Sequence, residues 1–185
     1  MKFFVFLVPT FLISLTLQAQ IKTVKVETPT YEKGWAYEDY PFPDGIKVYK
    51  LNKEKHVLKA EGLTLVQLWS IDAGGDPQTW RAFEKLIDKY KGKGLKTISV
   101  NFENGVDFKV QQAMLKKFFA TTKEPENFYF DYMGYSVDML RTPGFPMYSL
   151  VDKNGRVVFR TNGKDAEGMD ILDAELNDRL NGVRK

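Results

Sequence analysis

The sequence predicts an α/β protein with a mixed central sheet that is flanked by helices on both faces. Two observations predict this class. Apolar runs of strand length alternate with helical periodicity across 46–120, and this order requires parallel strands joined by crossover helices. Further along, two apolar runs flank Asn154-Gly155, a strong hairpin signal that adds antiparallel strands. We therefore expect one sheet that contains both kinds of pairing.

The composition is that of one ordinary folded domain. The chain has 185 residues, of which 43% are hydrophobic, with 27 basic and 24 acidic side chains and a formal net charge of +3. This near balance argues against a nucleic-acid partner. Cysteine is absent, which excludes disulfides, cysteine nucleophiles and thiolate metal sites. The single histidine, His56, lies beside Lys55 and Lys59 and lacks the partners that a metal site needs, so we expect no metal and no cofactor.

The amino terminus has the pattern of a secretory signal peptide. Lys2 precedes an apolar run of 15 residues, Phe3–Leu17, and the small residue Ala19 marks the boundary. The run is shorter than the roughly 20 residues of a stable transmembrane helix. We expect residues 1–19 to be removed after Ala19, leaving a periplasmic or secreted protein with no stable membrane span. An uncleaved anchor is the alternative, whereas a lipoprotein would need the missing cysteine.

Residues 20–44 are expected to form an irregular leader that lies across a domain of residues 45–185. Three prolines interrupt the leader, which also carries an aromatic cluster: Trp35, Tyr37, Tyr40 and Phe42. The alternative is that these aromatic side chains form a contact surface for a partner.

Local patterns place the first elements of the domain. Strands are predicted at 46–51, 56–58 and 63–69. The glycines of Asp72–Pro77 then allow a tight turn. A helix follows, because Asp76 is a good N-cap, Pro77 suits the first helical position, and apolar residues recur at helical spacing up to Tyr90. Lys91–Gly94 supplies the cations and glycines that are typical of a helix end.

The remaining elements complete the alternation. Further strands are predicted at 95–102, 128–131, 147–152 and 157–160. Helical spacing marks 110–118 and the closing segment 169–180, and 135–140 is expected to form one helical turn. Thr142–Pro146 is expected to be a rigid turn.

Four motifs, in this order, resemble the thioredoxin-like superfamily and, within it, the exported TlpA-like branch of thiol-disulfide oxidoreductases. They are Leu65–Ser70, Trp80–Leu86 followed by Lys91–Leu95, Gly144-Phe145-Pro146, and Leu150–Val158. The resemblance spans about 46–180 and implies a thioredoxin-like fold with a cis-proline at Pro146.

The chain departs from this family at the reactive positions. The two cysteine positions hold Ala73 and Asp76, and disulfide exchange requires a thiolate. We therefore predict no catalytic residue and no thiol chemistry. The resemblance still implies a groove for an extended polypeptide, formed by Trp69, Ile71, Asp72, Phe145 and Pro146. The predicted function is an exported, redox-inactive protein that binds a protein or peptide partner, unless these residues only close the core.

Two alternatives stay open. Asp72 and Asp76 could form an acid/base pair or bind a small ligand or hard cation at the start of the helix. Asp76 is, however, already explained as an N-cap. The other alternative is a structural domain docked through the aromatic leader.

Overall fold

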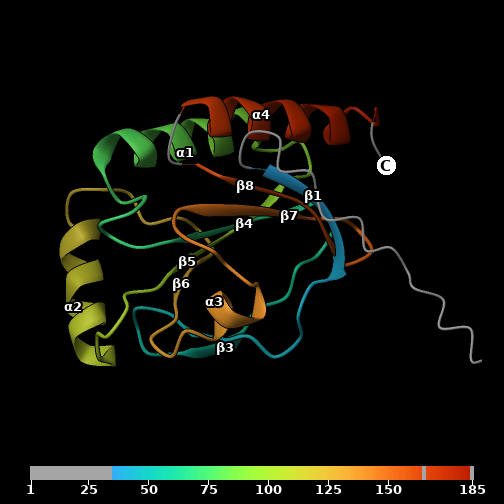
Figure 1. The fold of residues 1–185 in the computed structure, drawn as a ribbon. Coiled ribbons are helices and arrows are strands. Elements are labelled where there is room, and N and C mark those ends of the chain that lie inside the picture. Colours follow the sequence, from blue (N-terminus) through green and yellow to red (C-terminus); the bar gives the residue numbers. More distant parts are fainter. Residues whose placement is uncertain (1–34, 164–165, 184–185) are drawn as a thin grey trace, which may run out of the picture.

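The computed structural model describes residues 35–163 and 166–183, and Figure 1 shows their arrangement. Eight strands form a single sheet in the order β1-β8-β7-β4-β5-β6-β2-β3. The strands are β1 (Trp35–Pro41), β2 (Lys47–Tyr49), β3 (Lys55–Val57), β4 (Thr64–Trp69), β5 (Lys96–Asn101), β6 (Phe128–Phe130), β7 (Met147–Val151) and β8 (Arg156–Asn162). The expected signal peptide, residues 1–19, lies outside the described residues.

The pairing confirms the mixed sheet. β4, β5 and β6 are parallel to one another, whereas β7 and β8 run antiparallel to the strands beside them. The β4–β5 pair is joined by the crossover that the alternation of strand and helix predicted. β1 and β3 form the two edges of the sheet.

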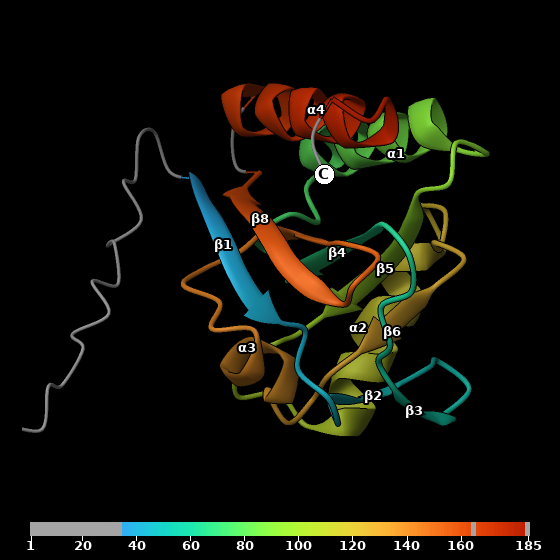
Figure 2. The same cartoon turned by 90° about the vertical axis from the view of Figure 1, so that its right-hand side faces the viewer.

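Helices lie on both faces of the sheet. They are α1 (Pro77–Tyr90), α2 (Phe108–Phe119), α3 (Tyr135–Met139) and α4 (Ala166–Leu180). On one face, α1 and α4 lie side by side in both views (Figures 1 and 2), and Trp80 of α1 contacts Phe118 of α2 with ring centroids 5.2 Å apart. On the other face, Leu140 at the end of α3 packs with Val66 and Leu68.

The central strand β4 shows why the sheet is sandwiched between these layers. All six of its residues are buried. Because successive side chains of a strand point to opposite faces, Leu65 packs with the α1 and α4 side chains and Val66 with the α3 side. A strand covered on both faces is a continuous apolar run instead of an alternating one, which is the pattern at 63–69.

The prediction of an irregular leader is wrong for residues 35–41. They form β1, which pairs antiparallel with β8. Pro41 is tolerated because it lies at the end of an edge strand, where a missing N–H costs little. Tyr40 and Phe42 pack against the core, so these two aromatics of the proposed contact surface serve the fold.

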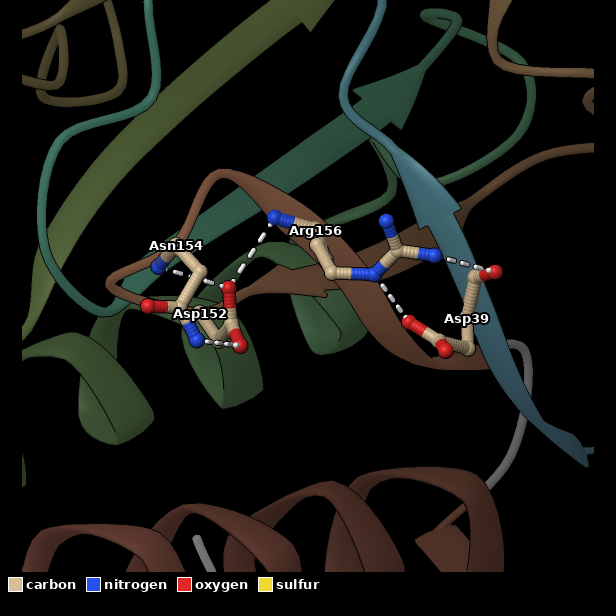
Figure 3. Close-up of polar contacts among 4 residues, drawn as sticks. All are labelled: Asp39, Asp152, Asn154 and Arg156. Atoms are coloured by element: carbon tan, nitrogen blue, oxygen red, sulfur yellow. Dashed lines mark hydrogen bonds and ion pairs between the residues drawn. The ribbon is translucent and has the colours of Figure 1, made fainter.

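Polar contacts fasten β1 to the β7–β8 hairpin (Figure 3). Arg156 pairs with the Asp39 carboxylate and donates to the Asp39 carbonyl at 2.8 Å. Asp152 organises the hairpin turn by accepting from the backbone N–H of Asn154 at 2.8 Å and of Arg156 at 3.0 Å. The turn that the Asn-Gly pair predicted is therefore also the place where the leader joins the domain.

A second, buried ion pair links the same two strands. The guanidinium of Arg160 lies 3.2 Å from the carboxylate of Glu38, and their side chains are only 8% and 17% exposed. Arg160 also donates to the carbonyl of Arg141 at 3.0 Å. Removing Glu38 would leave a buried cation short of its counter-charge, which is costly.

Candidate functional site

The candidate site is the turn that follows β4, where residues 70–76 connect the central strand to α1. Ser70 and Ala73 exchange backbone hydrogen bonds of 3.0 and 3.1 Å, and the Ser70 hydroxyl also accepts from the Ala73 N–H at 3.1 Å. These bonds close a compact turn. The side chain of Ala73 is a methyl group and adds no reactive atom to it.

Both glycines of the turn are required by close contacts, and the contacts differ between the two positions. Gly74 has a φ of +103°, and a Cβ there would lie 2.9 Å from Cβ of Pro146 and 3.2 Å from Cβ of Trp69. At Gly75 a Cβ would lie 2.6 Å from the carbonyl oxygen of Ile71. The first glycine therefore lets the turn pack on Pro146, and the second lets it fold back on itself.

Asp76 is the N-cap of α1, as the sequence predicted. Its carboxylate accepts from the backbone N–H groups of Gln78 and Thr79, both at 3.0 Å, and Pro77 occupies the first turn of the helix. The hydrogen bond from Thr79 is the main reason why the pKa of Asp76 lies below its ordinary value. A carboxylate held in its charged form is suited to capping and poorly suited to storing a proton.

On the opposite side of the turn, the Phe145–Pro146 peptide bond is cis. Pro146 is buried beneath Gly74, and its carbonyl accepts from the N–H of Gly163 at 3.2 Å. The Phe145 side chain is partly exposed, with its ring centroid 6.1 Å from that of Phe102. Within the described part of the chain, the backbone N–H and C=O of Phe145 make no hydrogen bond.

Trp69 does not lie in the surface of the groove where the sequence placed it. Its side chain is fully buried, and its indole N–H donates to the Ser99 hydroxyl at 3.0 Å. Its ring packs at a tilt against two others, with ring centroids 4.8 Å from that of Trp80 and 5.2 Å from that of Phe118. Trp69 therefore supports the turn from below. Of the five predicted groove residues, only Ile71, Asp72 and Phe145 have exposed or partly exposed side chains.

Sequence reasoning missed Glu103, a buried carboxyl group under the turn. Glu103 is 7% exposed, and its Oε1 accepts from the backbone N–H of Ile71 at 2.7 Å and from the Asn101 amide at 2.8 Å. Burial raises the pKa of Glu103, and the negative charge of Asp72 raises it further. The signal available in the sequence was an acid directly after a predicted parallel strand, where ligand sites of α/β sheets gather.

A buried polar chain continues from Glu103 into α2. Gln111 donates to the Asn101 side chain at 2.9 Å, and Asn101 donates to Glu103. This chain ties α2 through β5 to the turn. The turn is thus held at two places, by the contact of Gly74 with Pro146 and by the hydrogen bond from Ile71 to Glu103.

The surroundings favour an open surface over an enclosed pocket. Four hollows, of about 640, 490, 440 and 420 Å³, lie elsewhere, and none of them is lined by a residue of 70–76 or by Phe145. Among the described residues, no three His, Cys, Asp or Glu side chains are arranged to hold a metal ion. His56, half-buried in β3, lies 3.1 Å from Glu54.

No helix within 35–163 and 166–183 is both long enough and apolar enough to cross a bilayer.

The chain has the thioredoxin-like fold, as solved structures show. It superposes on a Chlorobium tepidum protein described as a thiol:disulfide interchange protein DsbE with a TM-score of 0.66 and 21% identity, over 77% of this chain and 97% of that chain. The pneumococcal exposed lipoprotein thioredoxin Etrx1 of Streptococcus pneumoniae gives 0.54 and 14%, over 72% and 99%. A secreted Mycobacterium tuberculosis disulfide oxidoreductase homologous to DsbE of E. coli gives 0.56 and 11%, over 71% and 94%.

These identities establish the fold alone. The sequence matches no family model and no curated protein. The molecule is therefore a thioredoxin-like domain in which Ala73 and Asp76 occupy the turn where the resemblance places cysteines, in a sequence that contains none.

Proposed function

We propose that this chain is an exported thioredoxin-like protein that carries out no thiol chemistry and binds a protein or peptide partner beside Pro146. The binding surface consists of Ile71, Asp72 and Phe145, with Pro146 and Trp69 beneath it. One observation carries the proposal. The turn keeps its close packing, with Gly74 in contact with Pro146, although the sequence contains no thiol.

The absence of thiol chemistry follows from the two substituted positions. Disulfide exchange needs a thiolate that attacks a sulfur atom. Ala73 has no nucleophile, and both backbone donors that Asp76 binds belong to α1. The lowered pKa of Asp76 also weighs against the alternative in which this side chain acts as a general acid.

The chemistry of the surface defines the kind of partner. The free N–H and C=O of Phe145 can pair with one extended residue of a polypeptide, as in strand addition. The side chains of Ile71 and Phe145 are apolar and partly exposed, so they can contact the partner. Asp72 is exposed and adds a negative charge. The surface therefore suits an extended segment that has an apolar side chain next to a cation or a hydrogen-bond donor.

Export is part of the same proposal. The pattern of residues 1–19 supports it, and two of the similar solved structures are of a secreted protein and of an exposed lipoprotein. Expression of the full chain should yield an exported protein whose first residue is Gln20, as read by amino-terminal sequencing. A mature protein that retains Met1 in the membrane fraction would contradict removal of the leader.

The binding proposal is tested by comparative capture from exported-protein extracts. Two baits alter the surface, Asp72→Arg and Phe145→Ala, and Asp88→Arg makes the same charge change on an exposed residue at the far end of α1. Circular dichroism and thermal melting confirm that each bait is folded. Trp69 is left intact because it is a core residue.

We expect a partner that the parent and Asp88→Arg retain and that both surface variants lose. A partner held equally by all four proteins would place the contact elsewhere. Reduction of a disulfide substrate by the purified parent protein would contradict the claim that it lacks thiol chemistry.

A further inference from the structure

Exposed hydrophobic side chains gather at a second place, away from the turn. Five large hydrophobic side chains are exposed within the described residues, and three of them, Val57, Met133 and Tyr135, line one hollow of about 440 Å³. The hollow lies between the β2–β3 hairpin and the loop that leads into α3. Single exposed apolar residues are common, whereas a cluster around one hollow marks a contact surface.

The hollow has a positive rim. Lys47 and Lys55 are exposed and line it, and none of its lining residues is acidic. Neither lysine forms an ion pair within the described part of the chain. The nearby acid Glu54 contacts His56 at 3.1 Å instead. Electrostatic complementarity therefore favours an anionic partner.

The backbone beside the hollow is free on one side. β3 is the last strand in the sheet order, and among the strands of 35–163 and 166–183 it pairs with β2 alone. Bonds of 2.9 Å from Lys50 N to Glu54 O and from Leu58 N to Ile46 O fix the register of the hairpin. Because such bonds alternate along an antiparallel pair, the N–H and C=O groups of Lys55 and Val57 point away from β2. An extended segment can pair with them.

The loop that presents Met133 and Tyr135 is fixed in place. The buried Asp131 carboxylate accepts from the backbone N–H of Met133 at 3.0 Å, of Gly134 at 2.9 Å and of Ser136 at 2.6 Å. It also accepts from the Ser136 hydroxyl at 2.7 Å. A surface that is already ordered loses little conformational entropy when a partner binds.

We propose that this surface, formed by Lys47, Lys55, Val57, Met133 and Tyr135, docks an acidic, extended segment of another exported protein, which adds a strand to β3. Lys47, Lys55 and Val57 share one face of the β2–β3 hairpin. On that face an apolar side chain of the segment enters the hollow between Val57 and Met133, and carboxylates two positions away along the segment face the two lysines. A second copy of this chain fits less well, because segment 46–59 carries five lysines and one glutamate. Two such hairpins side by side repel each other.

The probe is a short synthetic peptide with the repeat Glu-Thr-Val-Thr, in which glutamate and valine share one face of the extended chain, and the control peptide has lysine in place of glutamate. Isotopically labelled protein, expressed from the full chain, is titrated and followed by NMR. We expect the acidic peptide to shift the backbone amides of Lys55–Val57 and Met133–Tyr135, with weaker binding as salt is added. The basic peptide should leave these amides unchanged.

Four variants, one of them a control on α1, separate the components of the surface. Lys47→Glu combined with Lys55→Glu should weaken binding of the acidic peptide roughly tenfold, whereas Lys85→Glu, on an exposed position of α1, should not. Val57→Pro removes an N–H that points outward and spares the β2–β3 bonds, so it should abolish binding in a folded protein. Val57→Ala, which keeps the N–H, should have a smaller effect.

Three results would overturn the proposal. They are shifts confined to other residues, equal binding of the basic peptide, and a concentration-dependent dimer whose formation moves these same amides. The last would identify a second copy as the occupant. None of these outcomes depends on the surface beside Pro146, so this proposal and the proposed function fail separately.

Discussion

Substitution of Gly74 by alanine should destabilise the protein more than any substitution at an open glycine of the chain. The new methyl group would lie 2.9 Å from Cβ of Pro146 and 3.2 Å from Cβ of Trp69. Both neighbours are buried, and neither contact atom is the far end of a flexible side chain. The turn, Pro146 or β4 must therefore shift.

The expected cost has two parts. A φ of +103° is unfavourable for alanine, at about 1–2 kcal/mol for positive-φ backbone. Overpacking against Pro146 and Trp69 adds about 1–3 kcal/mol. The sum, about 2–5 kcal/mol, corresponds to a loss of roughly 4–20 °C in melting temperature for a domain of this size.

Two matched controls separate these parts. Gly92 has a φ of +78° with nothing within 4 Å of a new Cβ, so Gly92→Ala measures the backbone part alone. Gly144 precedes Phe145, lacks a positive φ and has open space around it, so Gly144→Ala should change stability by less than about 1 kcal/mol. Urea denaturation of the three variants and the parent gives the free energies of unfolding.

The reasoning is refuted if Gly74→Ala costs no more than Gly92→Ala. That result would mean that the turn does not rest on Pro146, and it would remove the structural basis for a surface at this place.

Three further predictions concern charged side chains. Glu38→Ala should lower the free energy of unfolding by about 3 kcal/mol, because it leaves buried Arg160 without its carboxylate, and urea denaturation measures this. Asp76→Ala should cost about 1 kcal/mol by the same assay through loss of the α1 cap; no change would contradict the capping role. Glu103 has a pKa raised above its ordinary value of 4.5, so its charged form destabilises the native state. Stability should therefore decline as pH rises from that ordinary value through the raised one. Glu103→Gln keeps an acceptor for Ile71 and Asn101, and it should raise stability at neutral pH and flatten this decline; a parallel pH profile would contradict it.

The sequence predicted those features that local chemistry decides. The N-cap at Asp76 follows from residue type and spacing within one turn of helix. The continuous apolar run at 63–69 predicted the central strand because both of its faces are covered. The hairpin after Val151 is set by a turn whose hydrogen bonds lie between Asp152 and Arg156.

Local sequence patterns could not predict contacts between segments that are far apart in the chain. β1 exists because Ala36 and its neighbours pair with Arg160 and its neighbours in β8, more than a hundred positions along the chain. Trp69 was assigned to a groove because a local pattern cannot show that α2 covers its ring. Glu103 is buried because β5 places Asn101 and the turn next to it, and that adjacency depends on the whole sheet.

Photo-crosslinking at position 145 tests the central claim most directly. The photoreactive analogue p-benzoylphenylalanine replaces Phe145, a partly exposed aromatic residue, and in a parallel protein it replaces the exposed residue Asp88. Cells that export each protein are irradiated, and adducts are identified by mass spectrometry. The account predicts a polypeptide adduct at position 145 that is missing at position 88 and weakened by Asp72→Arg. No adduct at position 145, or the same adducts at both positions, would contradict it.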